Sequence, residues 1–391
     1  MSTNILEKCN NSCTHVLKNT NKPVLQSQQP LFLDTLAQLD QKSANALSIR
    51  ARTKWNSYNV MFDLVNYAEV KANKSLIKKD TYFKAYYCNA TLFQGLDGKI
   101  TTEYCKQRWC VTCNRIRTGI MWNKYEPPMR NLSMKFVTLT TSFTNYCDTQ
   151  SDLEFARKMY LTAIQSIWRK LQKKCGKIVA LRKTEVTYET RKTLDGKHTF
   201  HPHFHFLIED KNNSAHVLRD LWCEYFSEEK FKKYVAEKKK NNKYYAREKH
   251  DILNNKIKPY ATYYAQDVRV ADNNSFAETL KYLCKTHTEV FNEVSQEFET
   301  KLAYEPRIMD IIFFVFKNKK VIQGYNLPEV ELEDFDVECA TIFVTEKDKL
   351  RVWNWSHYDR TWIDLENGDF LTDGKFLSKN NFKYNLLNNS S

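Results

Sequence analysis

Three histidines alternate with other residues in one short stretch of the chain, at His201, His203 and His205. Successive side chains of an extended strand point to opposite faces, so the imidazoles share one face and Phe204 and Phe206 fall on the other. Neutral imidazole is a common ligand of divalent metal ions. The spacing therefore indicates a metal site on one face of a strand. A surface strand that is merely rich in histidine is the alternative.

A carboxylate in the preceding segment is placed to complete this site. Residues 178–188 are predicted to form a strand, and an Asp-Gly pair at 195–196 indicates the turn of a hairpin with the histidine strand. We expect Glu185 to lie on the face of His203 and His205. Two imidazoles and one carboxylate leave coordination positions open and suit Mn²⁺ or Mg²⁺ bound together with a phosphate. The sequence does not fix the register of the hairpin, so a solvated glutamate is the alternative.

Four cysteines upstream form a second candidate metal site. Cys110 and Cys113 have the spacing that lets two thiolates reach one tetrahedral ion, Cys105 lies five residues before them, and Cys88 is the candidate for the fourth ligand. A redox pair or unligated thiols are the alternatives. A thioredoxin-like pair would follow a strand in a βαβ context, and the sequence shows none. We therefore expect a structural Zn²⁺ site.

A third group of reactive residues falls on a helix predicted over 275–287. Glu278, Tyr282 and Lys285 lie at i, i+4 and i+7, so they project from one face of that helix. A tyrosine can act as a nucleophile, the lysine can stabilise a phenolate or a phosphate, and the glutamate can serve as a base. Ser275 and Glu278 also have the spacing of a capping box, so capping is the alternative role for the glutamate.

The rest of the chain alternates between strand and helix patterns. The predicted strands cover 134–141, 267–270, 311–316, 340–344 and 350–355. The predicted helices cover 151–174 and 215–226, with two or three more between 30 and 78 after a polar start that we expect to be disordered. These patterns predict an α+β fold.

Composition narrows the class of partner. The formal charge is +14 and the pI is about 9.1, a balance that favours a polyanion such as nucleic acid. Aromatic residues make up 14% of the chain, and some of them suit stacking on unpaired bases. No apolar run approaches the ~20 residues that span a bilayer, and the N-terminus lacks the pattern of a secretory signal. We expect a cytoplasmic protein with reduced or metal-bound thiols.

The order of these motifs resembles the rolling-circle plasmid replication initiators of the HUH endonuclease superfamily, over about residues 85 to 290. The resemblance rests on the cysteine cluster and on four motifs in chain order: Thr138-Leu-Thr140, Glu185-Val-Thr187, His201-Pro-His203-Phe-His205 and Glu278-x-x-x-Tyr282-x-x-Lys285. The chain looks like the branch that has a single catalytic tyrosine and a glutamate four residues before it.

This resemblance implies an antiparallel central sheet with helices on one face and the metal site on the other. It implies that His203, His205 and Glu185 bind the divalent ion, and that Tyr282 cleaves one DNA strand at a plasmid origin. The tyrosine then keeps a 5′-phosphotyrosine link while the freed 3′-OH primes synthesis. Glu278 would activate water at termination, and Lys285 matches the lysine of the tyrosine motif. A host helicase and polymerase would be further partners.

We accordingly expect four regions: an N-terminal extension over 1–80, a zinc module over 81–130, an endonuclease domain over 131–300 and a β-rich extension over 301–391. Two other functions stay open. A transposase or relaxase would share the nicking chemistry and differ in its DNA. A non-enzymatic, zinc-stabilised regulator would bind nucleic acid with structural histidines. The sequence leaves the oligomeric state and the nick site open.

Overall fold

The computed structural model describes residues 41–70, 73–95, 100–142, 147–190, 198–227, 229, 260–280, 283–292, 297–327 and 349–371. The chain divides into two compact units, Met1–Ile49 and Arg50–Ser391, and the following account concerns the second. Helix α3, Gln41–Glu69, begins in the first unit and ends in the second. Residues 1–40, for which we expect disorder followed by a helical start, lie outside the described part. Among the described residues, no helix combines the length and the apolarity that a membrane crossing requires.

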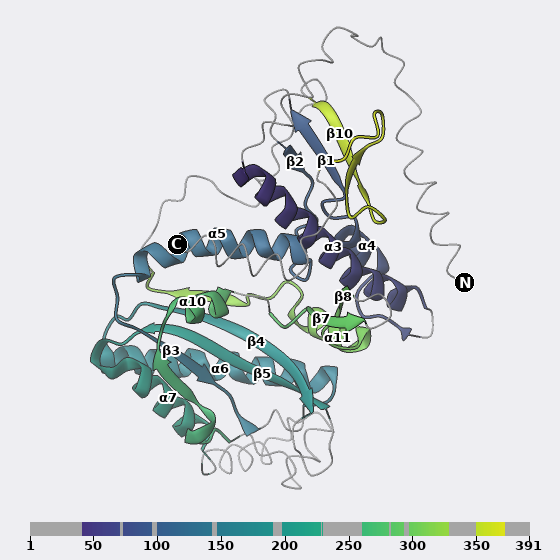
Figure 1. The fold of residues 1–391 in the computed structure, drawn as a ribbon. Helices are drawn as coiled ribbons and strands as arrows, with labels where there is room; N and C mark the ends of the chain where they lie inside the picture. The colour runs from purple at the N-terminus through teal and green to yellow at the C-terminus, as the bar shows by residue number, and fades with distance from the viewer. Residues whose placement is uncertain are drawn as a thin grey trace. The chain divides into compact units, whose positions relative to one another are not determined.

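A five-stranded antiparallel sheet carries the histidine strand near its centre (Figure 1). In spatial order its strands are β6 (Asp267–Val270), β3 (Met134–Leu139), β5 (His198–Glu209), β4 (Ala180–Thr190) and β9 (Ile322–Tyr325). The strands expected around 134–141, 178–188 and 267–270 are confirmed, and β4 pairs with β5 as the hairpin prediction requires. The fold is α+β, with antiparallel sheets.

Two helices cover one face of this sheet, α6 (Gln150–Cys175) and α7 (Ser214–Tyr225). The helix α6 begins at a capping box formed by Thr149 and Asp152, which satisfies backbone N–H groups that have no partner within the helix. Its buried stripe packs against Phe204 and Phe206, the side chains that alternate with the histidines. Each large apolar side chain buried in this way contributes roughly 1.5–3 kcal/mol.

The opposite face is partly covered as well. Helix α10 (Asn273–Leu280) contacts β4 and β5, and it packs against α5 (Val111–Met129). The apolar residues Phe136, Leu181 and Leu207 lie on this second face and form a buried cluster with these helices. The sequence predicted helices on one face of the sheet only, whereas helices cover part of both faces. Exposed apolar side chains at this end of the sheet would be costly, so the two helices bury them.

Segments from both ends of the sequence share a second, four-stranded sheet. Its order is β11 (Thr361–Asp364), β10 (Lys349–Ser356), β1 (Thr91–Gly95) and β2 (Ile100–Thr102). The strand expected at 350–355 is confirmed, and it pairs with β11 on one side and with β1 on the other. A two-stranded ribbon joins β7 (His287–Asn292) to β8 (Glu297–Leu302).

One expected strand is a helix. The stretch 311–316 belongs to α11, Pro306–Phe316, which starts with Glu305 at the N-cap and proline at the first position. Most of this helix is buried, so its apolar run has no polar side and mimics a buried strand in sequence. A buried carboxylate, Asp310, accepts hydrogen bonds from the N–H of Ile77, before the short helix α4 (Lys79–Tyr86), and from the hydroxyl of Tyr82 within that helix. The strand expected at 340–344 lies outside the described residues.

Candidate metal centres

The register between β4 and β5 brings Glu185, His203 and His205 together. Glu185 lies directly opposite His203, and Lys183 lies opposite His205, so all four share one face of the sheet. The candidate ligand atoms of Glu185, His203 and His205 all lie within 4.8 Å of one another. Glu185 Oε2 is 3.2 Å from His205 Nε2. Neighbouring ligands of an octahedral ion bound at about 2.1 Å are about 3 Å apart, so this spacing suits such an ion.

Backbone and hydroxyl groups orient the two imidazoles. His203 Nδ1 lies 3.0 Å from the carbonyl oxygen of His201, which can only accept, so Nδ1 carries the proton. Its Nε2 is therefore the unprotonated nitrogen that a metal ion needs. His205 Nδ1 contacts the Thr138 hydroxyl at 3.1 Å, and its ring stacks on Phe136 with centroids 5.1 Å apart. Both histidines are buried, which restricts their rotamers.

The protonation states of this group also suit a cation. Burial, together with the neighbouring His205, lowers the pKa of His203 to about 4. Burial raises the pKa of Glu185, but the hydrogen bond with His205 and the charge of Lys183 outweigh it and hold this pKa at about 2. At neutral pH Glu185 is therefore anionic and His203 neutral, as metal ligands must be.

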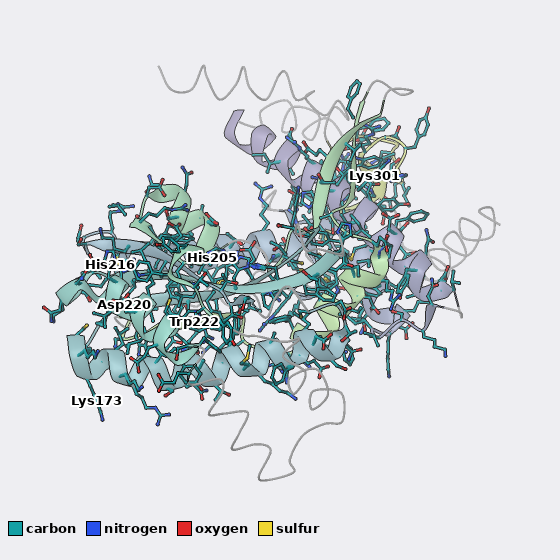
Figure 2. All side chains as sticks on the ribbon, turned by 90° about the horizontal axis from the view of Figure 1, so that it is seen from below. Lys173, His205, His216, Asp220, Trp222 and Lys301 are labelled. Atoms are coloured by element: carbon teal, nitrogen blue, oxygen red, sulfur yellow. The ribbon has the colours of Figure 1, made fainter. Side chains whose placement is uncertain are left out.

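Lys183 and Glu278 lie at the edge of the site. The Lys183 ammonium, 1% exposed, donates to Glu185 Oε2 at 2.6 Å and to the backbone carbonyl of Glu278 at 2.9 Å. The carboxylate of Glu278 lies 3.9 Å from His205 Nε2 and 3.4 Å from Arg269. It is 39% exposed, so solvent reaches it. Lys183 thereby fastens α10 to the sheet beside the histidines (Figure 2 labels His205).

The cap of α10 differs from the expectation. Asp272 accepts hydrogen bonds from the Ser275 N–H at 2.7 Å and from the Ser275 hydroxyl at 2.6 Å, and its own N–H donates to that hydroxyl at 3.3 Å. Asp272, not Ser275, therefore caps the helix, which begins at Asn273. The capping role considered for Glu278 is therefore wrong, because its carboxylate faces Arg269 and His205 instead.

The helix predicted over 275–287 is shorter than expected. It ends at Leu280, and β7 begins at His287, so Lys285 does not share a helical face with Glu278. Lys285 is exposed and contacts the Thr288 hydroxyl at 3.4 Å. Tyr282 lies outside the described residues. Leu283 is held beside the Glu185 group, because its carbonyl accepts a hydrogen bond of 2.9 Å from the N–H of Val186, the neighbour of Glu185.

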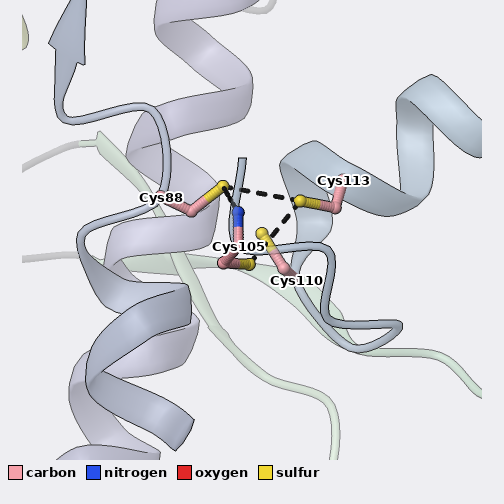
Figure 3. Close-up of side chains that lie close together, drawn as sticks. All are labelled: Cys88, Cys105, Cys110 and Cys113. Carbon is pink, nitrogen blue, oxygen red and sulfur yellow. Dashed lines mark hydrogen bonds between the residues drawn. The ribbon is translucent and has the colours of Figure 1, made fainter. Parts of the chain in front are cut away.

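The four predicted cysteines form a second compact group (Figure 3). Cys110 is the N-cap of α5 and Cys113 lies in its first turn, whereas Cys88 follows α4. The Sγ–Sγ distances from Cys113 to Cys88 and to Cys105 are both 3.5 Å. A disulfide requires about 2.05 Å, so these are separate thiols. Four sulfurs bound at about 2.3 Å around a tetrahedral Zn²⁺ lie about 3.8 Å apart, which this group nearly matches.

Sulfur chemistry supports the same assignment. Three of the four cysteines are buried, and the Cys88 sulfur accepts a hydrogen bond of 3.4 Å from the Cys105 N–H. Hydrogen bonds from the other three thiols lower the pKa of Cys110, which favours a thiolate. The group has donor atoms, burial and spacing that fit a metal ion such as Zn²⁺, and Cys88 reaches it from 17 residues before Cys105 in the sequence.

Sequence reasoning missed a buried lysine beside this cluster. Lys54, 1% exposed, donates to the backbone carbonyls of Tyr86 and Cys88 at 2.7 and 2.8 Å. Burial lowers the pKa of Lys54, and the charges of Cys88, Cys110 and Cys105 raise it. Burial prevails, so the pKa is about 8. Nothing in the local pattern of α3 marks Lys54. Lys183 could have been found, because strand alternation places it on the face of Glu185.

His201 is not part of the Glu185 group. Its Nε2 lies 3.3 Å from the Thr140 hydroxyl, and its ring centroid lies 5.6 Å from that of His203. Two of the three alternating histidines therefore converge with Glu185, and the third lies next to them along the strand.

The chain matches no protein-family model, and neither a curated protein nor a solved structure matches it.

Proposed function

We propose that this chain is a DNA-nicking and strand-joining enzyme of the HUH type, a rolling-circle replication initiator of a plasmid. The observation that carries the proposal is the convergence of Glu185, His203 and His205 on one face of an antiparallel sheet. A protein that only bound nucleic acid would have no need for a buried, deprotonated set of ligands with open coordination positions. The charge of +14 supports a polyanionic substrate.

The proposed reaction is a transesterification at one phosphodiester. The phenolic oxygen of Tyr282 forms a bond to phosphorus, the bond from phosphorus to the 3′ oxygen breaks, and that oxygen leaves with a proton as a 3′-OH. The 5′ side of the DNA stays on the tyrosine, so the bond can be rejoined by the reverse step. A bound Mn²⁺ or Mg²⁺ would neutralise charge on the phosphate.

The residues around the ligands have distinct tasks. His203 presents a nitrogen lone pair and Glu185 supplies the negative charge, whereas His205 Nε2 would exchange its hydrogen bond with Glu185 for the ion. Lys183 orients Glu185 and fixes the end of α10, the helix that precedes Tyr282. Glu278 is half-exposed near His205, where it would activate water in the terminating step. Lys285 would contact a DNA phosphate from the segment that follows Tyr282.

The cysteine cluster has a structural task in this proposal. A closed set of four thiolates leaves no position for a substrate, whereas the Glu185 group does. Reduced thiols of this kind suit the cytoplasm, where a host helicase and polymerase would extend the freed 3′-OH.

The test is adduct formation with single-stranded DNA. The full chain with Mn²⁺ is mixed with a random pool of oligonucleotides labelled at the 3′ end, because the labelled fragment stays on the tyrosine. We expect a labelled protein band on a denaturing gel. Tyr282→Phe, His203→Ala and excess EDTA should each abolish it, and mass spectrometry should find the DNA on the peptide that contains Tyr282.

Matched variants control for general damage. Tyr264 is 99% exposed, so Tyr264→Phe should keep the adduct. His216 lies on α7, which covers the other face of the sheet, so His216→Ala should keep it too (Figure 2). An unchanged adduct in Tyr282→Phe would move the nucleophile elsewhere. DNA binding without any adduct would favour the zinc-stabilised regulator, and cleavage of transposon ends instead of a plasmid origin would favour a transposase.

A further inference from the structure

A small cavity lies beside the cysteine cluster, outside the metal group on β4 and β5. Its volume is about 120 Å³, and three segments line it. They are the loop between Cys105 and Cys110, the segment that begins at Leu283, and the end of α11. One water needs about 10–15 Å³ by the same measure, so there is room for a single planar ring but not for a peptide.

The inner wall of the cavity is aromatic. Trp109, Phe313 and Phe316 line it, and the rings of Trp109 and Phe313 stack with centroids 5.3 Å apart and an angle of 21°. Trp109 is 5% exposed, yet its indole N–H has no acceptor among the described residues. A buried donor without a partner costs about 1–3 kcal/mol, so a ligand that brings an acceptor would relieve this cost. Nucleobases combine a flat apolar face with carbonyl or ring-nitrogen acceptors.

The rim of the cavity is positively charged. Lys106, Arg108 and Lys317 line it and are exposed, and the described lining residues include no acid. The Arg108 guanidinium also contacts the carbonyl of Lys319, which holds the loop against the end of α11. Three cations at one rim repel each other. A phosphate at the rim would relieve that repulsion.

The cavity also lies close to the proposed nicking site. Leu283 and Cys284 line it, and the Leu283 carbonyl accepts from the N–H of Val186, next to Glu185. The wall of the cavity thus continues into the strand that carries the metal group.

We propose that the cavity binds one nucleotide of single-stranded DNA adjacent to the cleaved bond, with its base against Trp109 and Phe316 and its phosphate at Arg108 and Lys317. This inference rests on the proposed function, because it names a contact of the same substrate. The loop that carries Arg108 and Trp109 is held at both ends by ligands of the cysteine cluster, so the zinc module would position a substrate contact as well as stabilise the fold.

The experiment uses the full chain with Tyr282→Phe, so that binding is measured without cleavage. The probe is a short oligothymidylate with one 5-iododeoxyuridine, which crosslinks to aromatic side chains under light. We expect a crosslink in the peptides around Trp109 or Phe316. An abasic position at the site of that base should weaken binding at least about fivefold, the least that one stacked base contributes.

Charge variants give a second readout. Arg108→Gln with Lys317→Gln should reduce the crosslink and lower the salt dependence of log K by about 0.7, the contribution of the one phosphate of single-stranded DNA that the two side chains would neutralise together. Lys173→Gln with Lys174→Gln, in the last turn of α6, is the matched control and should change neither. Crosslinks found only elsewhere, or an unchanged salt dependence in the first pair, would overturn the cavity assignment. A crosslink in the cavity, together with no adduct from the chain that keeps Tyr282, would refute nicking and keep this site.

Discussion

Replacing Glu185 by glutamine removes one partner of a buried charge pair at the centre of the site. The Lys183 ammonium is 1% exposed and lies 2.6 Å from Glu185 Oε2, so the variant leaves a buried cation against an amide and a backbone carbonyl. Breaking a buried pair from one side costs about 3–5 kcal/mol. The side chain of Glu185 is 20% exposed, which favours the lower end, about 3 kcal/mol.

The pKa of Glu185 gives a similar magnitude. Burial raises it, but the hydrogen bond with His205 and the charge of Lys183 prevail, and the pKa falls from 4.5 to about 2. One pKa unit corresponds to about 1.4 kcal/mol, so the charged carboxylate contributes about 3 kcal/mol to folding. Because the folded pKa is the lower one, this contribution is complete above pH 4.5 and is lost as the pH falls through about 2.

Urea denaturation at neutral pH, without added divalent ions, measures both effects. We expect Glu185→Gln to lower the free energy of unfolding by about 3 kcal/mol. Adding Lys183→Met to this variant removes the stranded cation, so the double variant should be more stable than Glu185→Gln alone. The control is Asp267→Asn, which breaks an exposed pair with Arg269 and should cost no more than about 1 kcal/mol.

Two results would refute this reasoning. A loss below about 1 kcal/mol in Glu185→Gln would mean that the pair is as weak as a surface ion pair. A double variant that is less stable than Glu185→Gln would mean that Lys183 stabilises the site through its bond to the Glu278 carbonyl and not through Glu185.

Two further predictions concern the cysteine cluster and the helix that packs beside it. Cys113→Ser should lose the Zn²⁺ that we expect to co-purify, measured with a chromogenic chelator after denaturation, whereas Cys223→Ser on α7 should keep it. Asp310→Asn should lower the free energy of unfolding by about 3 kcal/mol, because the carboxylate accepts four hydrogen bonds. In the variant the amide NH₂ group would face some of these donors and could not accept from them. Asp220→Asn, an exposed position on α7, should cost under about 1 kcal/mol, and equal losses would contradict the argument.

Strand alternation was sufficient to predict which side chains of the candidate site share one face of a strand. The period of two places all three histidines on one face, and the same rule places Glu185 and Lys183 together. The register that sets Glu185 opposite His203 depends on the pairing of β4 with β5, which is a property of the hairpin and not of either strand. The convergence of the ligands could therefore be expected from the sequence but not fixed by it.

Long-range packing explains what the sequence could not reveal. The apolar run of α11 is buried on nearly every side, so it lacks the polar stripe that distinguishes a helix from a buried strand. The pairing of β1 with β10 joins residues more than 250 positions apart, and no local pattern encodes it. Lys54 is a hydrophilic residue in a helix, and only the fold shows that it is buried against the carbonyl of Cys88.

The two candidate metal groups would carry net charges of opposite sign once an ion is bound. Four thiolates around one Zn²⁺ carry a net charge of about −2, and such a charge is costly to bury unless cations lie near it. Lys54 lies beside this cluster, and Arg50 lies near it. Burial lowers the pKa of Arg50, and the charge of Cys88 acts in the opposite direction. The Glu185 group has one carboxylate against a divalent ion, and Lys183 adds positive charge. That site is left electropositive once the ion binds, which is the state that attracts a phosphodiester. Under the proposed function, the sign of this remaining charge would separate a centre that stabilises the fold from one that binds DNA.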